Sequence, residues 1–310
     1  MRARRFRSKM KLGIVVVYIF GEESAPLLDL HLSYIKRYTG VPYVIYASVN
    51  RLEARFRDAL AHHPMVRICE CPDTPLRSLK EHSYYLDHLV RFAIEDGVSH
   101  VVTLHLDSFP VRSGWVEELA GRLSESCLLA TIDRINTACL FFHRDFYLRY
   151  RPSFFLSPEE REDVVYRKYI DEYDPLQHSG IGYGFTAYRN GKSWYYLKNT
   201  TKVDYTGAGR VYDDIIFHLV SAVRTGATYS QPSGWLQSPG WGRFMKMVLA
   251  VARVATPPKV RTFLLQRFDS FIDRVVDKPQ LVHLATSHAP KIQLFMENPE
   301  KYLRLLRKER

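Results

Sequence analysis

Two side chains that can bind a metal ion stand at the end of the apolar segment SHVVTLHLD (99–107). These are His105 and Asp107, and the segment is then broken at Pro110. If the segment is a strand, its alternation places both side chains on one face. An imidazole with a carboxylate suits Mn²⁺ better than the all-oxygen shell that Mg²⁺ prefers. The simpler alternative is that Asp107 caps the following turn and His105 packs in the interior.

The elements that would position these side chains alternate between strand and helix. The first, LGIVVVYIF (12–20), is a continuous β-branched and aromatic segment, which is typical of a parallel strand covered on both faces. Further strands are expected at 41–49, 65–70 and 99–107, and helices at 27–38, 51–63 and 82–97. This order predicts an α/β fold with a mostly parallel, doubly wound sheet. Such sheets bind ligands at the carboxyl ends of their strands.

The pattern changes after Pro110, and the chain divides into four regions. We expect a basic tail at 1–11, an α/β domain at 12–225, a loop or linker at 226–242 and a helical C-terminal region at 243–310. Within the later part of the domain we expect helices at 115–123 and 213–224, strands at 127–134, 138–147 and 193–198, and partial helix over 151–176. Amphipathic helices are expected at 243–255, 259–276 and 298–309.

A longer unit around His105 and Asp107 matches a known enzyme family in its order. SYYLDHLVRFAIEDGVSHVVTLHLDSFPV combines a helix, a strand, two metal-competent residues one apart, a small residue and an aromatic-Pro pair. It resembles the Asp-x-Asp region of GT-A-fold nucleotide-sugar glycosyltransferases. Asp107 matches the second acid of that motif. His105 stands where the first acid is expected, which is a departure from the family pattern.

A second part of the resemblance lies downstream, and the whole covers about residues 10–225. QHSGIGYGFTAYRNGKSWYYL (177–197) is similar to the second acidic motif in layout, and His218 stands where the family has a late metal-binding histidine. The resemblance therefore implies that His218 completes a metal site with His105 and Asp107. At the catalytic position the chain has His178, whose ordinary pKa near 6.5 suits a general base, with Asp174 as the other candidate. Alternatively, His178 bonds to backbone in a loop.

Four further residues are candidates for contacts to the donor. Gly21 and Asn50 follow the first two expected strands and are candidate nucleotide contacts. Arg77 and Lys80 precede the helix at 82–97, where they could reach a diphosphate. The alternative for this pair is a solvated surface charge.

The resemblance implies a glycosyltransferase of hexosyltransferase type. It would move a sugar from a nucleotide-sugar donor to a glycan or lipid-linked acceptor, with inversion and with help from Mn²⁺ or Mg²⁺, as in polysaccharide biosynthesis. Because histidine replaces acid at two positions, a catalytically degenerate nucleotide-binding module is one alternative. A sugar nucleotidyltransferase, which uses a similar sheet and metal edge, is another.

The net charge of +11 is concentrated at the two ends of the 310-residue chain. Residues 1–11 carry six basic and no acidic residues, and residues 301–310 carry five basic and one acidic. The near-neutral body argues against a nucleic-acid partner. The basic ends suit an anionic membrane surface, or are solvated ends with no partner. The apolar segment at 12–20 is too short to span a bilayer. We therefore expect a cytoplasmic protein, either free or bound peripherally at the inner face of the membrane.

Overall fold

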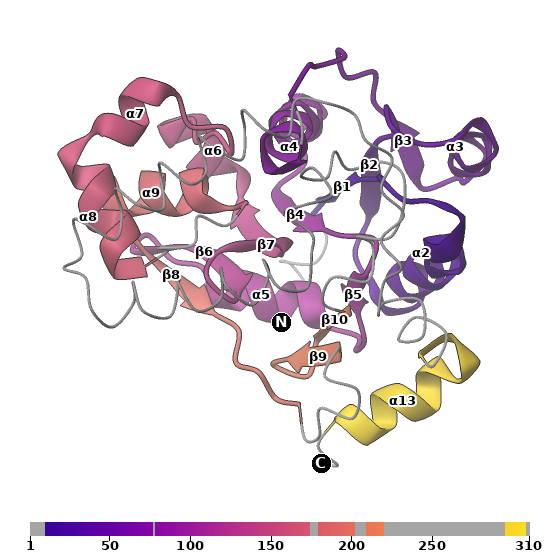
Figure 1. The fold of residues 1–310 in the computed structure, drawn as a ribbon. Helices are drawn as coiled ribbons and strands as arrows, with labels where there is room; N and C mark the ends of the chain where they lie inside the picture. The colour runs from indigo at the N-terminus through magenta and orange to yellow at the C-terminus, as the bar shows by residue number, and fades with distance from the viewer. Residues whose placement is uncertain (1–9, 77, 174–178, 202–208, 220–294, 308–310) are drawn as a thin grey trace, which may run out of the picture.

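A mixed seven-stranded sheet forms the centre of the protein (Figure 1). The computed structural model describes residues 10–76, 78–173, 179–201, 209–219 and 295–307. The strand order is β3-β2-β1-β4-β7-β6-β8. The first four strands in sequence order are mutually parallel: β1 (Leu12–Val17), β2 (Tyr43–Ser48), β3 (Val66–Ile68) and β4 (His100–Leu104). β7 (Asn136–His143) runs antiparallel to β4 and to β6 (Cys127–Ile132), and β8 (Ser193–Tyr196) is parallel to β6.

Helices cover both faces of this sheet, so the fold is doubly wound, as predicted. Alternate residues of β1 belong to different core clusters, because successive strand side chains point to opposite faces. Leu12 and Ile14 pack with α2 (Pro26–Tyr38), α3 (Ala54–Ala61) and α5 (Trp115–Arg122). Val15 and Val17 pack with α4 (Ser78–Glu95), α6 (Arg144–Tyr150) and α9 (Ile181–Arg189). α7 (Pro158–Glu162) and α8 (Val164–Tyr173) lie at the β8 end (Figure 1).

The strand order reverses between β1 and β4. From β1 the chain proceeds outward through β2 and β3, and then returns to place β4 on the other side of β1. The loops that follow β1 and β4 diverge at this point, where open α/β sheets hold their ligands. The first loop contains the short 3₁₀ helix η1 (Glu22–Ser24), and the second contains His105 and Asp107.

A second, antiparallel sheet of three strands extends from the end of β4. Its order is β5 (Ser108–Pro110), β10 (Ile216–Leu219) and β9 (Gly209–Tyr212). The C-terminal helix α13 (Pro299–Leu306) adds Tyr302 to the same core, and the ring of Phe295 stacks on Phe217 at 5.0 Å between centroids. The predicted helix at 298–309 is therefore present as α13. The predicted segments 243–255 and 259–276 lie outside the described residues.

The helix predicted at 213–224 is wrong over the part that the structure describes. Asp213 and Asp214 form a turn with φ values of 46° and 57°, and Ile216–Leu219 is strand β10. A short apolar run such as IIFHL fits either structure by its periodicity alone. Here the ladders to β5 and β9 decide in favour of a strand.

The described helices include none that is both long and apolar enough to cross a membrane.

The alternating glycines of GIGYGF (180–185) let helix α9 approach its neighbours closely. A Cβ on Gly180 would lie 2.0 Å from the carbonyl oxygen of Ile135, and one on Gly182 would lie 1.8 Å from that of Ser153. Real Cβ atoms do not come this close to backbone. This motif therefore packs a helix against two loops and is not a phosphate-binding loop.

Gly182→Ala is expected to destabilise the protein by about 1–3 kcal/mol, because the backbone at Ser153 must move to admit the methyl group. Chemical denaturation measures the effect. Gly121→Ala is the matched control, since Gly121 is exposed in α5 and its new Cβ would meet nothing within 4 Å. That variant should be unchanged or more stable by up to about 1 kcal/mol. Equal stability of Gly182→Ala and the unmodified protein would contradict the close approach.

Candidate metal centre

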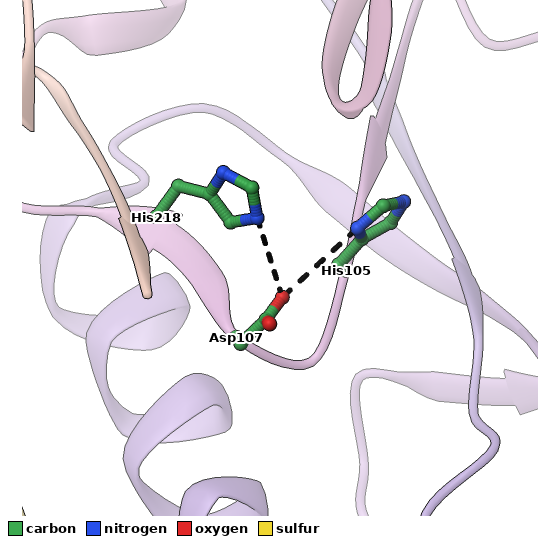
Figure 2. A group of neighbouring side chains, drawn as sticks. All are labelled: His105, Asp107 and His218. Carbon is green, nitrogen blue, oxygen red and sulfur yellow. Dashed lines mark ion pairs between the residues drawn. The ribbon is translucent and has the colours of Figure 1, made fainter. Parts of the chain in front are cut away.

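His105, Asp107 and His218 meet at the carboxyl end of β4 (Figure 2). His218 Nε2 lies 3.7 Å from Asp107 Oδ1, and His105 Nδ1 lies 4.0 Å from the same oxygen. One ligand atom from each of the three residues lies within 4.8 Å of the other two. The structure thus brings together the three side chains that the sequence analysis grouped.

The turn after β4 aims the first two side chains. The strand ends at Leu104, so the prediction that it continues to Asp107 is wrong. His105 and Asp107 share a side because of a turn that the Ser108 hydroxyl closes. This hydroxyl accepts from the His105 amide at 2.8 Å and donates to the Ala138 carbonyl at 2.6 Å. Because the backbone of β7 helps to hold this turn, the sheet itself fixes the direction of Asp107.

Strand pairing brings His218 to the same place. In the antiparallel ladder of β10 with β5, His218 is opposite Ser108, the residue after Asp107. The next amide, of Leu219, donates to the Asp107 carbonyl at 2.8 Å. A helix over 213–224 could not form this ladder. His218 therefore lies beside Asp107 because 216–219 is a strand.

A hydrogen-bonded chain orients the His105 ring. Its Nε2 lies 2.9 Å from the Thr137 hydroxyl, which in turn forms a short hydrogen bond with the Ser179 hydroxyl. The Thr103 hydroxyl donates to the Thr137 carbonyl at 2.7 Å. With Nε2 engaged in this way, Nδ1 faces Asp107. Metal-binding histidines are ordinarily held through their second nitrogen like this, and the sequence contained no signal for Thr137 or Ser179.

Two further histidines lie near the cluster, and burial keeps both rings neutral at pH 7. The His82 ring of α4 lies 5.2 Å from that of His105, and burial lowers the pKa of His82 to about 4. His31 of α2 is fully buried, and its burial lowers its pKa to about 3, against a smaller opposing effect of the Ser108 and Leu106 backbone. Neither ring therefore repels a cation at the cluster. Neither histidine stands out in the sequence, because each lies among apolar residues of a helix.

The donor set fits a divalent transition metal. Two ligands bound at about 2.1 Å to one ion are about 3.0 Å apart at a right angle and about 4.2 Å apart when opposite. The two separations from Asp107, 3.7 and 4.0 Å, lie in this range, and the ligand atoms of the two histidines lie within 4.8 Å of each other. Two imidazoles and one carboxylate suit Mn²⁺, Fe²⁺ or Zn²⁺ better than Mg²⁺. Asp107 and His218 are only 3% and 7% exposed, whereas His105 is partly exposed, so the cluster is accessible mainly on the His105 side.

The structure describes three of the six other predicted site residues: Asn50, Gly21 and Lys80. The Asn50 amide donates to the Cys71 carbonyl at 2.8 Å and to the Asp73 carboxylate at 3.1 Å, so it joins the segments after β2 and β3. Gly21 precedes η1, and its carbonyl accepts from the Ser24 amide. Lys80 is half-buried in the first turn of α4. Arg77, Asp174 and His178 lie outside the described residues, so their predicted roles remain predictions.

Comparisons with known proteins do not assign a family. No protein-family model matches the sequence, and no curated protein is significantly similar to it. Among solved structures, the fold is similar to a crystal structure from Desulfovibrio desulfuricans G20, provisionally named a nucleotide-diphospho-sugar transferase. The two are 13% identical, the match covers 61% of this chain and 79% of the other, and the TM-score is 0.36. A similarity this weak does not establish an activity.

Thr137→Val is expected to weaken Mn²⁺ binding about 10- to 100-fold, because valine keeps the shape but removes the hydroxyl that holds His105. Isothermal titration calorimetry with Mn²⁺ measures this. Thr186→Val is the control, since Thr186 is also buried but lies within α9. If both variants bind Mn²⁺ like the unmodified protein, Thr137 does not orient a ligand.

Proposed function

We propose that the protein is a nucleotide-sugar-dependent glycosyltransferase that acts on a glycan or lipid-linked acceptor. The observation that carries this proposal is the meeting of His105, Asp107 and His218 at the end of β4. A divalent cation held there would be in position to bind the diphosphate of a nucleotide-sugar donor. The order of elements around Asp107, which resembles that of GT-A-fold enzymes, supports the same conclusion.

The location of the cluster in the sheet also supports the proposal. It adjoins the point between β1 and β4 where the strand order reverses. Ligands of open α/β sheets bind there, outside the carboxyl ends of the strands. Gly21 and Asn50 follow β1 and β2 at the same edge, so the loops that carry them are available to a nucleotide. We assign the nucleotide to these loops, with Arg77 and Lys80 as candidate diphosphate contacts.

In the proposed reaction, three side chains hold the cation and another removes a proton. His105, Asp107 and His218 would hold Mn²⁺ or Mg²⁺, which offsets the charge that develops on the departing diphosphate. His178, or Asp174, would accept the proton of the acceptor hydroxyl as its oxygen attacks the anomeric carbon. The bond from that carbon to the diphosphate oxygen breaks on the opposite side, so the configuration inverts.

Asp107→Asn is expected to reduce turnover about 100-fold or more. The amide keeps the size of the carboxylate but removes the one negative charge of the predicted ligand set, and metal catalysis contributes several kcal/mol. The assay measures release of nucleoside diphosphate from a panel of nucleotide sugars in the presence of Mn²⁺. Asp145→Asn is the control, because the Asp145 side chain of α6 is 77% exposed.

Other outcomes of the same assay would contradict the proposal. Pyrophosphate release from a nucleoside triphosphate and a sugar phosphate would identify a sugar nucleotidyltransferase. Binding of nucleotide sugar without turnover would identify a degenerate module. Turnover by Asp107→Asn equal to that of Asp145→Asn would separate the activity from the cluster.

We also propose that the protein works in the cytoplasm at the inner face of the membrane. The basic residues of 1–11 and 301–310 support this part of the proposal, because a basic residue near an anionic surface contributes about 1 kcal/mol. Lys301 and Arg304 are exposed on α13.

Replacement of Arg2, Arg4, Arg5, Arg7 and Lys9 by glutamine is expected to reduce binding to phosphatidylserine vesicles at least about tenfold. Co-sedimentation of the full chain measures binding, and vesicles of neutral phosphatidylcholine are the control. Added salt should weaken the binding of the unmodified protein. Equal partitioning of the two proteins would contradict a role for this basic tail.

A further inference from the structure

Two adjoining hollows open at the β8 edge of the sheet, formed by residues that are not part of the metal centre. Their volumes are about 330 and 260 Å³, and Tyr173 of α8 and Tyr196 of β8 line both. Tyr188 of α9 and Trp194 of β8 complete the wall of the smaller one. We refer to the pair as the aromatic hollow. The volume of the larger one is within the range of small-ligand sites.

The aromatic rings of the hollow hold one another in place. The Trp194 ring lies 5.0 Å from Tyr173 at 79° and 6.3 Å from Tyr196 at 80°, measured between ring centroids. Tyr173 and Tyr188 are 5.6 Å apart at 60°. These are the edge-to-face arrangements that aromatic pairs prefer. Rings that are already fixed lose little freedom when a ligand packs on them, and Tyr196 is 38% exposed.

The residues that line the hollow include charges of both signs. Asp133 and Glu172 line it together with Arg134, and Lys192 lines the smaller part. The Glu172 carboxylate accepts a hydrogen bond from Tyr173, which raises the pKa of Tyr173 to about 12. The formal charges of these four lining residues cancel, so the lining itself carries no net charge. A neutral ligand rich in hydroxyl groups would find both donors and acceptors.

A strained turn holds two of these charged residues at the hollow. Arg134 and Ile135, between β6 and β7, have φ values of 41° and 51°. This left-handed conformation is unusual, above all for a β-branched side chain. It is held by the burial of Ile135 and by Tyr212, whose hydroxyl donates to Asp133 at 2.5 Å. Strain of this kind concentrates at ligand-binding positions.

The same turn connects the hollow to the metal centre. Thr137, which orients His105, follows Arg134 by three residues, so their Cα atoms are at most about 11 Å apart. On the other side, Arg210 lies 3.9 Å from Asp133 and is opposite His218 in the β9–β10 ladder. A ligand longer than one ring could therefore extend from the hollow toward the cluster.

We propose that the aromatic hollow binds a sugar ring of a neutral glycan. The C–H face of the ring packs on Tyr196, which lines both parts of the hollow, and its hydroxyl groups bond to Asp133, Arg134 and Glu172. That this glycan is the acceptor rests on the proposed function, whereas the binding itself does not.

The test is calorimetric titration of the full chain, without donor, with neutral oligosaccharides of glucose, galactose, mannose and N-acetylglucosamine. At least one should bind, and Tyr196→Ala should weaken it about tenfold or more, because the ring surface is lost. Tyr196→Phe should retain the affinity, since it keeps the ring. Tyr38→Ala, at the far end of α2, is the control and should bind as the unmodified protein does.

Three results would overturn the proposal: no binding by any sugar of the panel, equal binding by Tyr196→Ala, or tighter binding of choline or a proline-rich peptide. Asp107→Asn separates this inference from the proposed function. If that variant binds glycan normally while donor turnover is lost, both stand. If the unmodified protein binds glycan but shows no turnover, only this inference stands. If the unmodified protein shows turnover but binds no glycan, only the proposed function stands.

Discussion

The antiparallel pairing of β10 with β5 is the interaction on which the candidate metal centre depends. The two strands are short, and their register alone sets His218 opposite Ser108 and therefore beside Asp107. The stacking of Phe295 on Phe217 and the packing of α13 cover the outer side of this small sheet. Because a short strand pair is marginal in isolation, the C-terminal helix supports the position of a histidine that lies far from it in the sequence.

The electrostatics of the cluster follow from burial. Asp107 is a buried carboxylate, and burying a charge is costly unless opposite charge accompanies it. His82 and His31 do not supply that charge, because burial keeps both rings neutral. A cation that His105 and His218 share with Asp107 would supply such charge, and this is the arrangement that the proposed function uses.

The hairpin of β6 and β7 links the metal centre to the aromatic hollow. Its turn carries Asp133 and Arg134 at the hollow, and its second strand begins at Asn136 and carries Thr137 to His105. The turn can lie flat on α9 because Gly180 has no side chain to meet the Ile135 carbonyl. The alternating glycines of GIGYGF (180–185) thus serve helix packing, beside both candidate sites.

The sequence by itself determined the α/β class, the four parallel strands and the pair His105 and Asp107, whereas the place of His218 was only implied by a family resemblance. Continuous apolar strands and amphipathic helices carry strong local signals, and metal-competent side chains at a strand end are visible without coordinates. Only the tertiary structure decided that 216–219 is a strand, that β4 ends at Leu104 and that Thr137 orients His105. The aromatic hollow likewise could not be read from the chain. Its walls come from a hairpin turn, two helices and an edge strand, and local periodicity contains no information about which distant segments pair.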